Sequence, residues 1–180
     1  MLLIGKKKVL VFDTETTGLP NSFSSSSLLD HEILQLAMID GTGTLLVNEF
    51  FKPAKKKVWP EAQKIHGISP KDVCNKPAIR EFSKIIQDFV DSAELLVAYN
   101  IQFDLLFLRS VGIKFLGKKY YDVMRGFSQS QGNRGRNKSM RRVPLKKCAA
   151  YYGYELADAH DAEADARATL HCFLKLQGEH

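Results

Sequence analysis

Two acidic side chains, Asp13 and Glu15, stand one residue apart in the stretch VFDTETTGL (residues 11–19). They follow an apolar run from Val9, which is typical of a buried strand. Residues i and i+2 of a strand share one face, so both carboxylates point the same way if the strand continues that far. Their repulsion is relieved by a cation, and Mg²⁺ or Mn²⁺ prefers oxygen ligands. The pair therefore favours a divalent metal site. The alternative is that Asp13 caps a turn and Glu15 is solvated.

A third acid, Asp104, lies in AYNIQFDLLFL (98–108), early in an expected helix that follows a buried strand. Taken alone, it is better explained as an acid favoured by the dipole at a helix N-terminus. Phosphatases of the haloacid-dehalogenase type also begin with an aspartate at a strand end. They would want a second aspartate where Glu15 stands, so this class fits the sequence less well.

A third cluster lies in ADAHDAEADARATL (157–170) and contains Asp158, His160, Asp161, Glu163 and Asp165. Asp161 and Asp165 would share one helical face, but spacing alone does not choose a ligand. His160 and Asp165 are five residues apart, about 140° around a continuous helix. They meet at one site only if His160 lies at or before the helix start, where a histidine could act as a general base. The alternative is an acid-rich helix start with an exposed histidine.

The expected elements alternate between strands and helices. Strands are predicted at 8–13, 32–40, 44–52, 94–99 and 118–124, with a tight turn at 41–43. Helices are predicted at 76–92, 101–112, 144–154 and 161–177. This order predicts an α/β fold with a central mixed sheet flanked by helices. Its first three strands form an antiparallel meander, and parallel strands follow.

Composition predicts one soluble domain over residues 1–180. Hydrophobic residues make up 44% and charged residues 26%, and no apolar run approaches the roughly 20 residues that span a membrane. The three cysteines, Cys74, Cys148 and Cys172, include no C-x-x-C pair. This argues against a disulfide framework and against a zinc site. We expect a cytoplasmic protein without a membrane partner.

The net charge of +6 is concentrated in one segment. Arg125 to Lys147 contains eight basic residues and no acid, which leaves 18 basic against 20 acidic residues elsewhere. Residues 125–142 show no apolar period and predict a long solvated loop. This loop is either an arm that contacts phosphates or an insertion without a partner. A second low-complexity loop, NSFSSSS, covers 21–27.

Taken together, the three clusters resemble a known family. FDTETTG (12–18), NIQFD (100–104) and HDAEAD (160–165) resemble, in order, the three motifs of the DEDDh 3′–5′ exonucleases. That DnaQ-like group has a ribonuclease H-like fold and includes the ε proofreading subunit of bacterial DNA polymerase III and RNase T. KIHGIS (64–69) is similar to a hallmark of the ε-like branch, which oligoribonucleases usually lack.

The resemblance implies a two-metal hydrolase using Mg²⁺ or Mn²⁺. Asp13, Glu15 and Asp165 would bind one ion, Asp13 would bridge to the second, and Asp104 would hold that one through water. His160 would deprotonate the attacking water, moving in once substrate and metals are bound. The other acids of the third cluster are then surface or capping residues. The product would be a nucleoside 5′-monophosphate released from a 3′ end.

The resemblance also implies substrate contacts. Thr16 would lie beside the terminal 3′ hydroxyl and sugar, Phe103 against the terminal nucleotide, and His66 against its base or sugar. The alternatives are core packing for Phe103 and loop capping for His66. We expect Arg134, Arg136, Arg141 and Arg142 to hold the nucleic acid strand.

The expected partners are 3′ ends of single-stranded DNA or RNA, with a DNA polymerase as a further one. Nothing identifiable reads a 2′-hydroxyl, so DNA and RNA are not separated here. One alternative is an RNA-trimming exoribonuclease of the RNase T kind. Another is a non-catalytic nucleic-acid-binding or polymerase-docking module, which has no need of four acids and a histidine.

Overall fold

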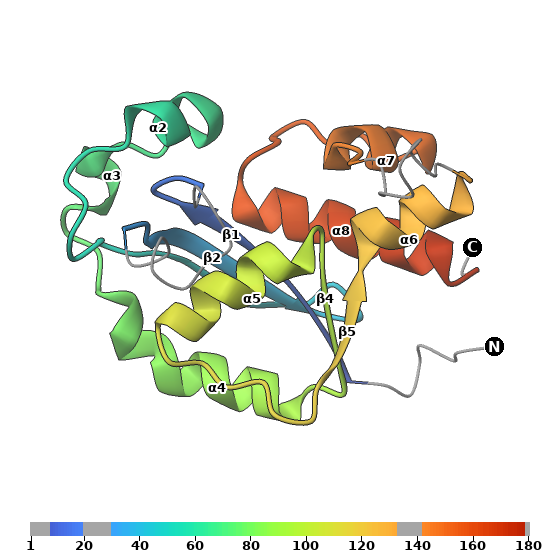
Figure 1. Ribbon diagram of the computed structural model, residues 1–180, viewed down its shortest axis with the longest axis horizontal. Helices are drawn as coiled ribbons and strands as arrows, with labels where there is room; N and C mark the ends of the chain where they lie inside the picture. Colours follow the sequence, from blue (N-terminus) through green and yellow to red (C-terminus); the bar gives the residue numbers. More distant parts are fainter. Residues whose placement is uncertain (1–7, 20–29, 133–141, 179–180) are drawn as a thin grey trace.

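A five-stranded mixed sheet forms the centre of the molecule in the computed structural model, which describes residues 8–19, 30–132 and 142–178 (Figure 1). The strand order is β3-β2-β1-β4-β5. The bounds are β1 Val9–Thr16, β2 Ile33–Asp40, β3 Leu45–Phe50, β4 Leu95–Ala98 and β5 Lys119–Asp122. The serine-rich stretch 21–27 and the predicted strand-holding residues Arg134, Arg136 and Arg141 lie outside the described residues.

The predicted meander is confirmed. β1 pairs antiparallel with β2, and β2 pairs antiparallel with β3, whereas β4 runs parallel to both β1 and β5. The turn between β2 and β3 is closed by Asp40, whose carboxylate accepts hydrogen bonds from the backbone N–H groups of Thr42 and Thr44. β1 runs on to Thr16, so the condition for placing Asp13 and Glu15 on one face is met.

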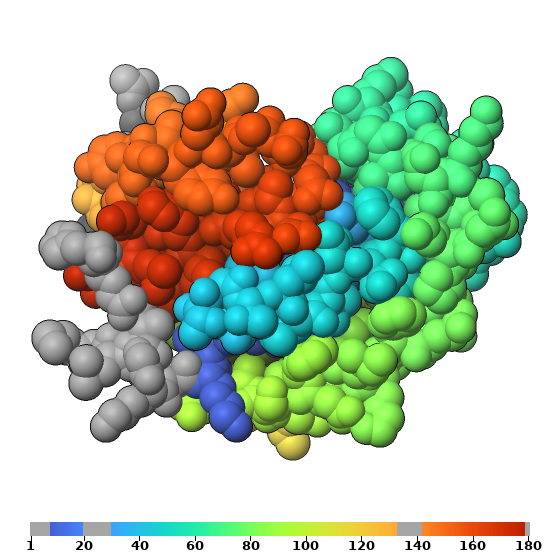
Figure 2. All heavy atoms as spheres, turned by 180° about the vertical axis from the view of Figure 1, so that it is seen from behind, coloured from blue at the N-terminus to red at the C-terminus, as the bar shows by residue number. Residues whose placement is uncertain are grey.

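Helices cover both faces of the sheet. α4 (Ser83–Ser92) and α5 (Ile101–Ser110) pack on the face that carries Leu10 and Phe12 of β1. α6 (Val123–Ser130), α7 (Leu145–Tyr151) and α8 (Ala162–Leu176) pack on the face that carries Val9 and Val11. Seen from behind, the red surface of α8 adjoins the blue-to-cyan surface of the β2–β3 hairpin (Figure 2). Alternate residues of β1 therefore face two different helical layers.

Two short helices beyond the end of β1 were not predicted. α2 (Pro60–His66) and α3 (Pro70–Val73) lie near the tip of the β1 arrow in Figure 1. Val73 of α3, Trp59 just before α2 and Ile68 between the two helices form a small cluster with Leu34 of β2. The apolar residues of α2 and α3 are too few for a clear helical period, because each helix is about two turns or less.

The helix predicted for 76–92 is wrong in its first part. Ala78 is extended, a 3₁₀ turn η2 covers Ile79–Phe82, and α4 begins only at Ser83. Pro77 accounts for the non-helical backbone at Lys76, because the residue before a proline is disfavoured in helical backbone. The side chain of Glu81 then accepts the Ala78 N–H and caps the 3₁₀ turn.

The loop predicted for 125–142 is also wrong at its start. α6 occupies Val123–Ser130, so the strand predicted for 118–124 ends at Asp122. The Asp122 carboxylate accepts the Arg125 N–H and starts this helix. Val123 and Phe127, four residues apart, bury its inner face. Among the described residues, no helix is long and apolar enough to cross a membrane.

Candidate active site

Acids from both sides of the sheet converge where β1 ends. Asp13 and Glu15, both half-buried, lie on the strand face that turns toward α8. Asp104 comes from α5 on the other face and is 2% exposed. Thr14 lies between the two acids of β1, and its hydroxyl donates to Asp104 Oδ1 at 2.7 Å. That hydrogen bond ties the start of α5 to the end of β1.

His160 precedes α8, so the condition for it to meet Asp165 at one site is fulfilled. It lies in a turn with a left-handed backbone (φ 71°), and α8 begins at Ala162. The Asp161 carboxylate caps the helix by accepting the Ala164 N–H at 3.0 Å. The His160 N–H points to Asp165 Oδ2 at 3.4 Å. One side-chain atom from each of Glu15, His160 and Asp165 lies within 4.8 Å of the other two.

A buried amide that sequence reasoning missed holds this turn in place. Gln35 of β2 is 1% exposed, and its Nε2 donates to Asp161 Oδ2 at 2.9 Å. Its Oε1 accepts the Ala162 N–H at 3.2 Å. Asn48 of β3 accepts from the same Nε2 at 3.1 Å and donates to Glu163 at 2.7 Å. The available signal was one polar residue inside the buried strand ILQLAMID.

Burial disfavours the ionised forms of all four acids, and neighbouring acids add to this effect at Asp13 and Glu15. Burial, and then the neighbouring acids, raise the pKa of Glu15 to about 9 and push that of Asp13 well above its usual range. Burial raises the pKa of Asp104 to about 7, although the Thr14 hydroxyl opposes the change. Burial also raises the pKa of Asp165 to about 6. Such a cluster is costly near neutral pH unless a cation compensates it.

The donor set fits a hard divalent cation. Asp165 Oδ1 is buried and has no hydrogen-bond partner among the described residues. A buried carboxylate oxygen without a partner is costly, and a metal ion would satisfy it. Carboxylate oxygens from three elements suit Mg²⁺ or Mn²⁺ rather than a soft metal. The site therefore offers a possible metal-binding group.

These acids line a cleft of about 440 Å³. The lining includes all five predicted catalytic residues, namely Asp13, Glu15, Asp104, His160 and Asp165, together with the predicted substrate residues Phe103 and Arg142. The Phe103 ring is half-buried and packs against Phe107 with centroids 4.8 Å apart. Phe103 thus combines core packing with a position on the cleft wall.

Thr16 and His66 do not line this cleft but support its edge. His66 Nδ1 accepts the Ile68 N–H at 3.0 Å, so Nε2 must carry the proton that is donated to the Thr16 carbonyl at 3.1 Å. The Thr16 hydroxyl donates to the Gly18 carbonyl at 2.9 Å. Burial lowers the pKa of His66, which agrees with a neutral ring. Both predicted substrate contacts therefore have structural partners, and their substrate role stays a prediction.

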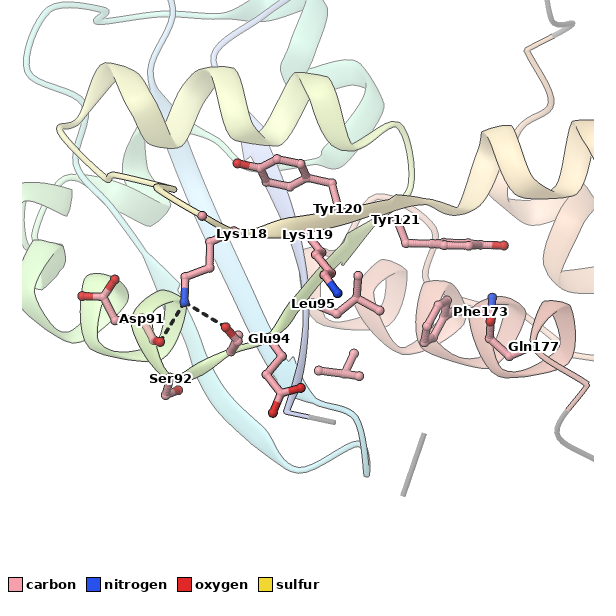
Figure 3. Close-up of a pocket in the computed structure, with 13 residues that line it drawn as sticks. Asp91, Ser92, Glu94, Leu95, Lys118, Lys119, Tyr120, Tyr121, Phe173 and Gln177 are labelled. Carbon is pink, nitrogen blue, oxygen red and sulfur yellow. Dashed lines mark hydrogen bonds between the residues drawn. The ribbon is translucent and has the colours of Figure 1, made fainter. Parts of the chain in front are cut away.

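A larger hollow of about 970 Å³ lies at the opposite end of the sheet, where β1, β4 and β5 begin (Figure 3). Lys118 closes one side by donating to the carbonyls of Asp91 and Ala93. Tyr121 and Phe173 meet edge to face on the other side. None of the predicted site residues lines this hollow. Choosing the functional site by cavity volume alone would therefore miss the acid cluster.

Comparison with known proteins identifies the family. A family model described as exonuclease (RNase T) matches residues 10–173. An uncharacterized exonuclease of Escherichia phage 186 is 28% identical over 172 residues, which cover 89% of this chain and 84% of that protein. The DNA polymerase III subunit epsilon of Buchnera aphidicola is 29% identical over 121 residues, 65% of this chain and 50% of that protein. The chain thus spans half the length of that epsilon subunit.

Solved structures share the fold. Exonuclease I aligns with a TM-score of 0.73 at 21% identity, covering 95% of this chain and 40% of that chain. Exonuclease X in complex with 5′-overhanging duplex DNA aligns with a TM-score of 0.70 at 18% identity, covering 94% of this chain and 91% of that one. The ribonuclease H-like fold expected from the motifs is confirmed. Because the family model spans most of the sequence and its acids meet in one cleft, the chain belongs to the exonuclease family, as a DEDDh-type, DnaQ-like hydrolytic nuclease.

Proposed function

We propose that this chain removes nucleotides one at a time from the 3′ end of single-stranded DNA and releases nucleoside 5′-monophosphates. The observation that carries the proposal is the meeting of Asp13, Glu15, Asp104, His160 and Asp165 in one cleft. These residues come from β1, α5 and the start of α8, so the fold brings together what 152 positions separate in the sequence. The whole chain acts as a single exonuclease domain.

Asp13, Glu15 and Asp165 would hold one divalent cation, and Asp13 and Asp104 would hold a second. Mg²⁺ and Mn²⁺ are the candidates because every donor is a carboxylate oxygen. When bound, two such ions stabilise the attacking and leaving oxygens of a phosphoryl displacement. This assignment is supported by Asp165 Oδ1, which has no hydrogen-bond partner in the described part of the chain, and by the raised pKa values of the acids.

His160 accepts the proton of the attacking water. Its side chain is exposed at the cleft and lies near Glu15 and Asp165, as a base that meets water requires. Among the described residues, the contacts that anchor its turn run through Asp161 and Ala162 to Gln35 and not through the imidazole. The ring can therefore turn toward the substrate.

The 3′-terminal nucleotide would lie between Phe103 and the backbone beside Thr16. His66 sets the position of that backbone by binding the Thr16 carbonyl. Arg142, exposed on the cleft wall, would contact a phosphate, with Arg134, Arg136 and Arg141 of the same basic segment extending that contact. Similarity to epsilon subunits supports DNA as the substrate and a polymerase as a partner.

The test is a gel time course with 5′-labelled single-stranded DNA and RNA of matched sequence. We expect a ladder that shortens from the 3′ end with Mg²⁺ or Mn²⁺, stops in EDTA and is faster on DNA. Asp13→Asn should abolish the ladder. Asp158→Asn, an exposed acid two residues before His160, is the matched control and should retain it. Faster shortening of RNA would favour the exoribonuclease alternative. Strands that are bound but not shortened would favour the binding module.

A further inference from the structure

A second hollow adjoins the catalytic cleft. We call it the aromatic hollow; it has a volume of about 530 Å³ and is lined by Phe127, Gln131, Arg142, Val143, Pro144, Lys147, Ala150 and Tyr151. Arg142, Val143 and Pro144 also line the cleft, so the two spaces share one wall. A nucleic acid strand whose 3′ end lies at the catalytic acids must leave the cleft along some path. The shared wall leads directly to the aromatic hollow.

An exposed aromatic ring forms one side of this hollow. Tyr151, at the end of α7, is 60% exposed. Its ring is held edge-on by Phe127, with centroids 5.3 Å apart, and by Tyr152 at 5.0 Å. Phe127 also contacts Tyr152, so the three rings brace one another. A fixed aromatic face left open to solvent is a stacking platform that loses little conformational entropy on binding.

Positive charge lies beside this ring. Arg142 and Lys147 are both exposed and line the hollow, and no acid does so among the described residues. Neither cation forms an ion pair within the described part of the chain. An exposed ring flanked by two uncompensated cations matches a nucleotide, which has a flat base and an anionic phosphate. An apolar peptide would leave both charges unused.

We propose that the aromatic hollow binds a nucleotide of the single strand on the 5′ side of the scissile one. Its base stacks on Tyr151, and its backbone phosphates meet Lys147 and Arg142. This proposal rests on the exonuclease function and adds to it the path by which the strand leaves the cleft. Stacking tolerates any base and either sugar, so this subsite gives affinity without sequence preference.

The test compares substrates that reach the hollow with one that does not. A labelled single-stranded oligonucleotide, as DNA and as RNA, extends past the cleft. The methyl ester of thymidine 5′-monophosphate holds a single nucleotide, carries no ring on the 5′ side of its phosphate and ends there. The variants are Tyr151→Ala, Tyr151→Phe and Lys147→Ala. Lys119→Ala removes the same charge at the opposite end of the sheet and is the matched control.

Tyr151→Ala should raise KM for the oligonucleotide by about five-fold or more, the loss of one stacked base, with little change in kcat. Tyr151→Phe should restore KM, and neither variant should alter hydrolysis of the ester. Lys147→Ala should reduce the salt slope of oligonucleotide binding by about 0.7, one phosphate of a single strand. Lys119→Ala should leave that slope unchanged. Equal effects of these variants on the DNA and the RNA oligonucleotide would show that the hollow recognises the base and the phosphate and not the sugar.

Two kinetic results would overturn the proposal. An unchanged KM in Tyr151→Ala would mean that the strand leaves elsewhere. Equal losses on the oligonucleotide and on the ester would mean that Tyr151 only supports the fold. If the wild type hydrolyses neither substrate, the proposed exonuclease function is rejected, and the subsite is tested separately by binding. The Kd of the labelled strand, measured by fluorescence anisotropy in EDTA, then decides the subsite: five-fold weakening by Tyr151→Ala supports it, and an equal Kd rejects it.

Discussion

Replacing Asp104 by asparagine should stabilise the metal-free protein near pH 8 while abolishing its nuclease activity. Asp104 is 2% exposed, and burial raises the pKa of its carboxyl from 3.8 to about 7. The unfolded chain releases this proton above pH 3.8, whereas the folded chain holds it until about pH 7. The contribution of Asp104 to stability is therefore fully present below pH 3.8 and is lost as the pH rises through 7.

The size of the effect follows from the gap between those two pKa values. Each pH unit in that window costs about 1.4 kcal/mol, so the penalty reaches at most about 4 kcal/mol near pH 8. Relaxation of the cleft reduces it, and we expect a gain of roughly 1–4 kcal/mol for Asp104→Asn. Asparagine keeps the oxygen that accepts from the Thr14 hydroxyl, so that hydrogen bond survives.

The assay is urea unfolding in EDTA near pH 5 and near pH 8, followed by circular dichroism. The gain of Asp104→Asn over wild type should be larger at the higher pH, and Asp158→Asn, an exposed acid, should show no gain at either. The reasoning is refuted if Asp104→Asn is no more stable than wild type near pH 8. A gain that is equal at both pH values would also refute it, because burial of charge would then not be its source.

Three further changes test the same site. Added Mn²⁺ should raise Tm more near pH 8 than near pH 5. The pKa values of Asp104 (about 7) and Asp165 (about 6) are raised, so protons compete with the metal for these carboxylates at the lower pH. An equal rise in Tm at both pH values would contradict this. His160→Gln should lower kcat by roughly 10²–10⁴-fold, which is the usual contribution of a general base. The affinity for Mn²⁺, measured by calorimetry, should not change. Weaker Mn²⁺ binding would indicate that His160 is a metal ligand instead. Gln35→Leu should lower the free energy of unfolding in urea by about 1–3 kcal/mol, because Asp161 and the Ala162 N–H lose their buried partner. It should also lower kcat. An unchanged kcat would mean that the hydrogen bonds of Gln35 do not position the catalytic residues.

The strands and the convergent acids were predictable because their signals are local or follow the family motifs. Val9 to Phe12 is continuously apolar, and β1 carried Asp13 and Glu15 to its end as the i, i+2 rule required. Once the family resemblance assigned His160 and Asp165 to one site, their spacing required His160 to lie at or before the helix start, and the structure has it in a turn ahead of α8. The motif and the helix geometry were both needed for this prediction.

Features that depend on distant partners were not predictable. In the sequence, Gln35 is a single polar residue within an apolar strand. Its role in holding the turn before α8 is visible only from its hydrogen bond to Asp161, 126 positions away. The sequence of α6 predicts a loop because most of its residues are polar, and its buried face consists mainly of Val123 and Phe127, which pack against residues far along the chain. His66 was predicted from a motif, but its bond to the Thr16 carbonyl is visible only in the fold.

The central claim is that the acid cluster is a divalent-metal centre, and counting bound Mn²⁺ tests it most directly. Free Mn²⁺ is measured by electron paramagnetic resonance as it is titrated into the wild type, Asp165→Asn and the control Asp158→Asn. The account predicts two ions per chain for the wild type and the control, and fewer, weaker ions for Asp165→Asn, which lacks one of the ligands of the site. Equal Mn²⁺ binding by the wild type and Asp165→Asn, or none by either, would contradict it.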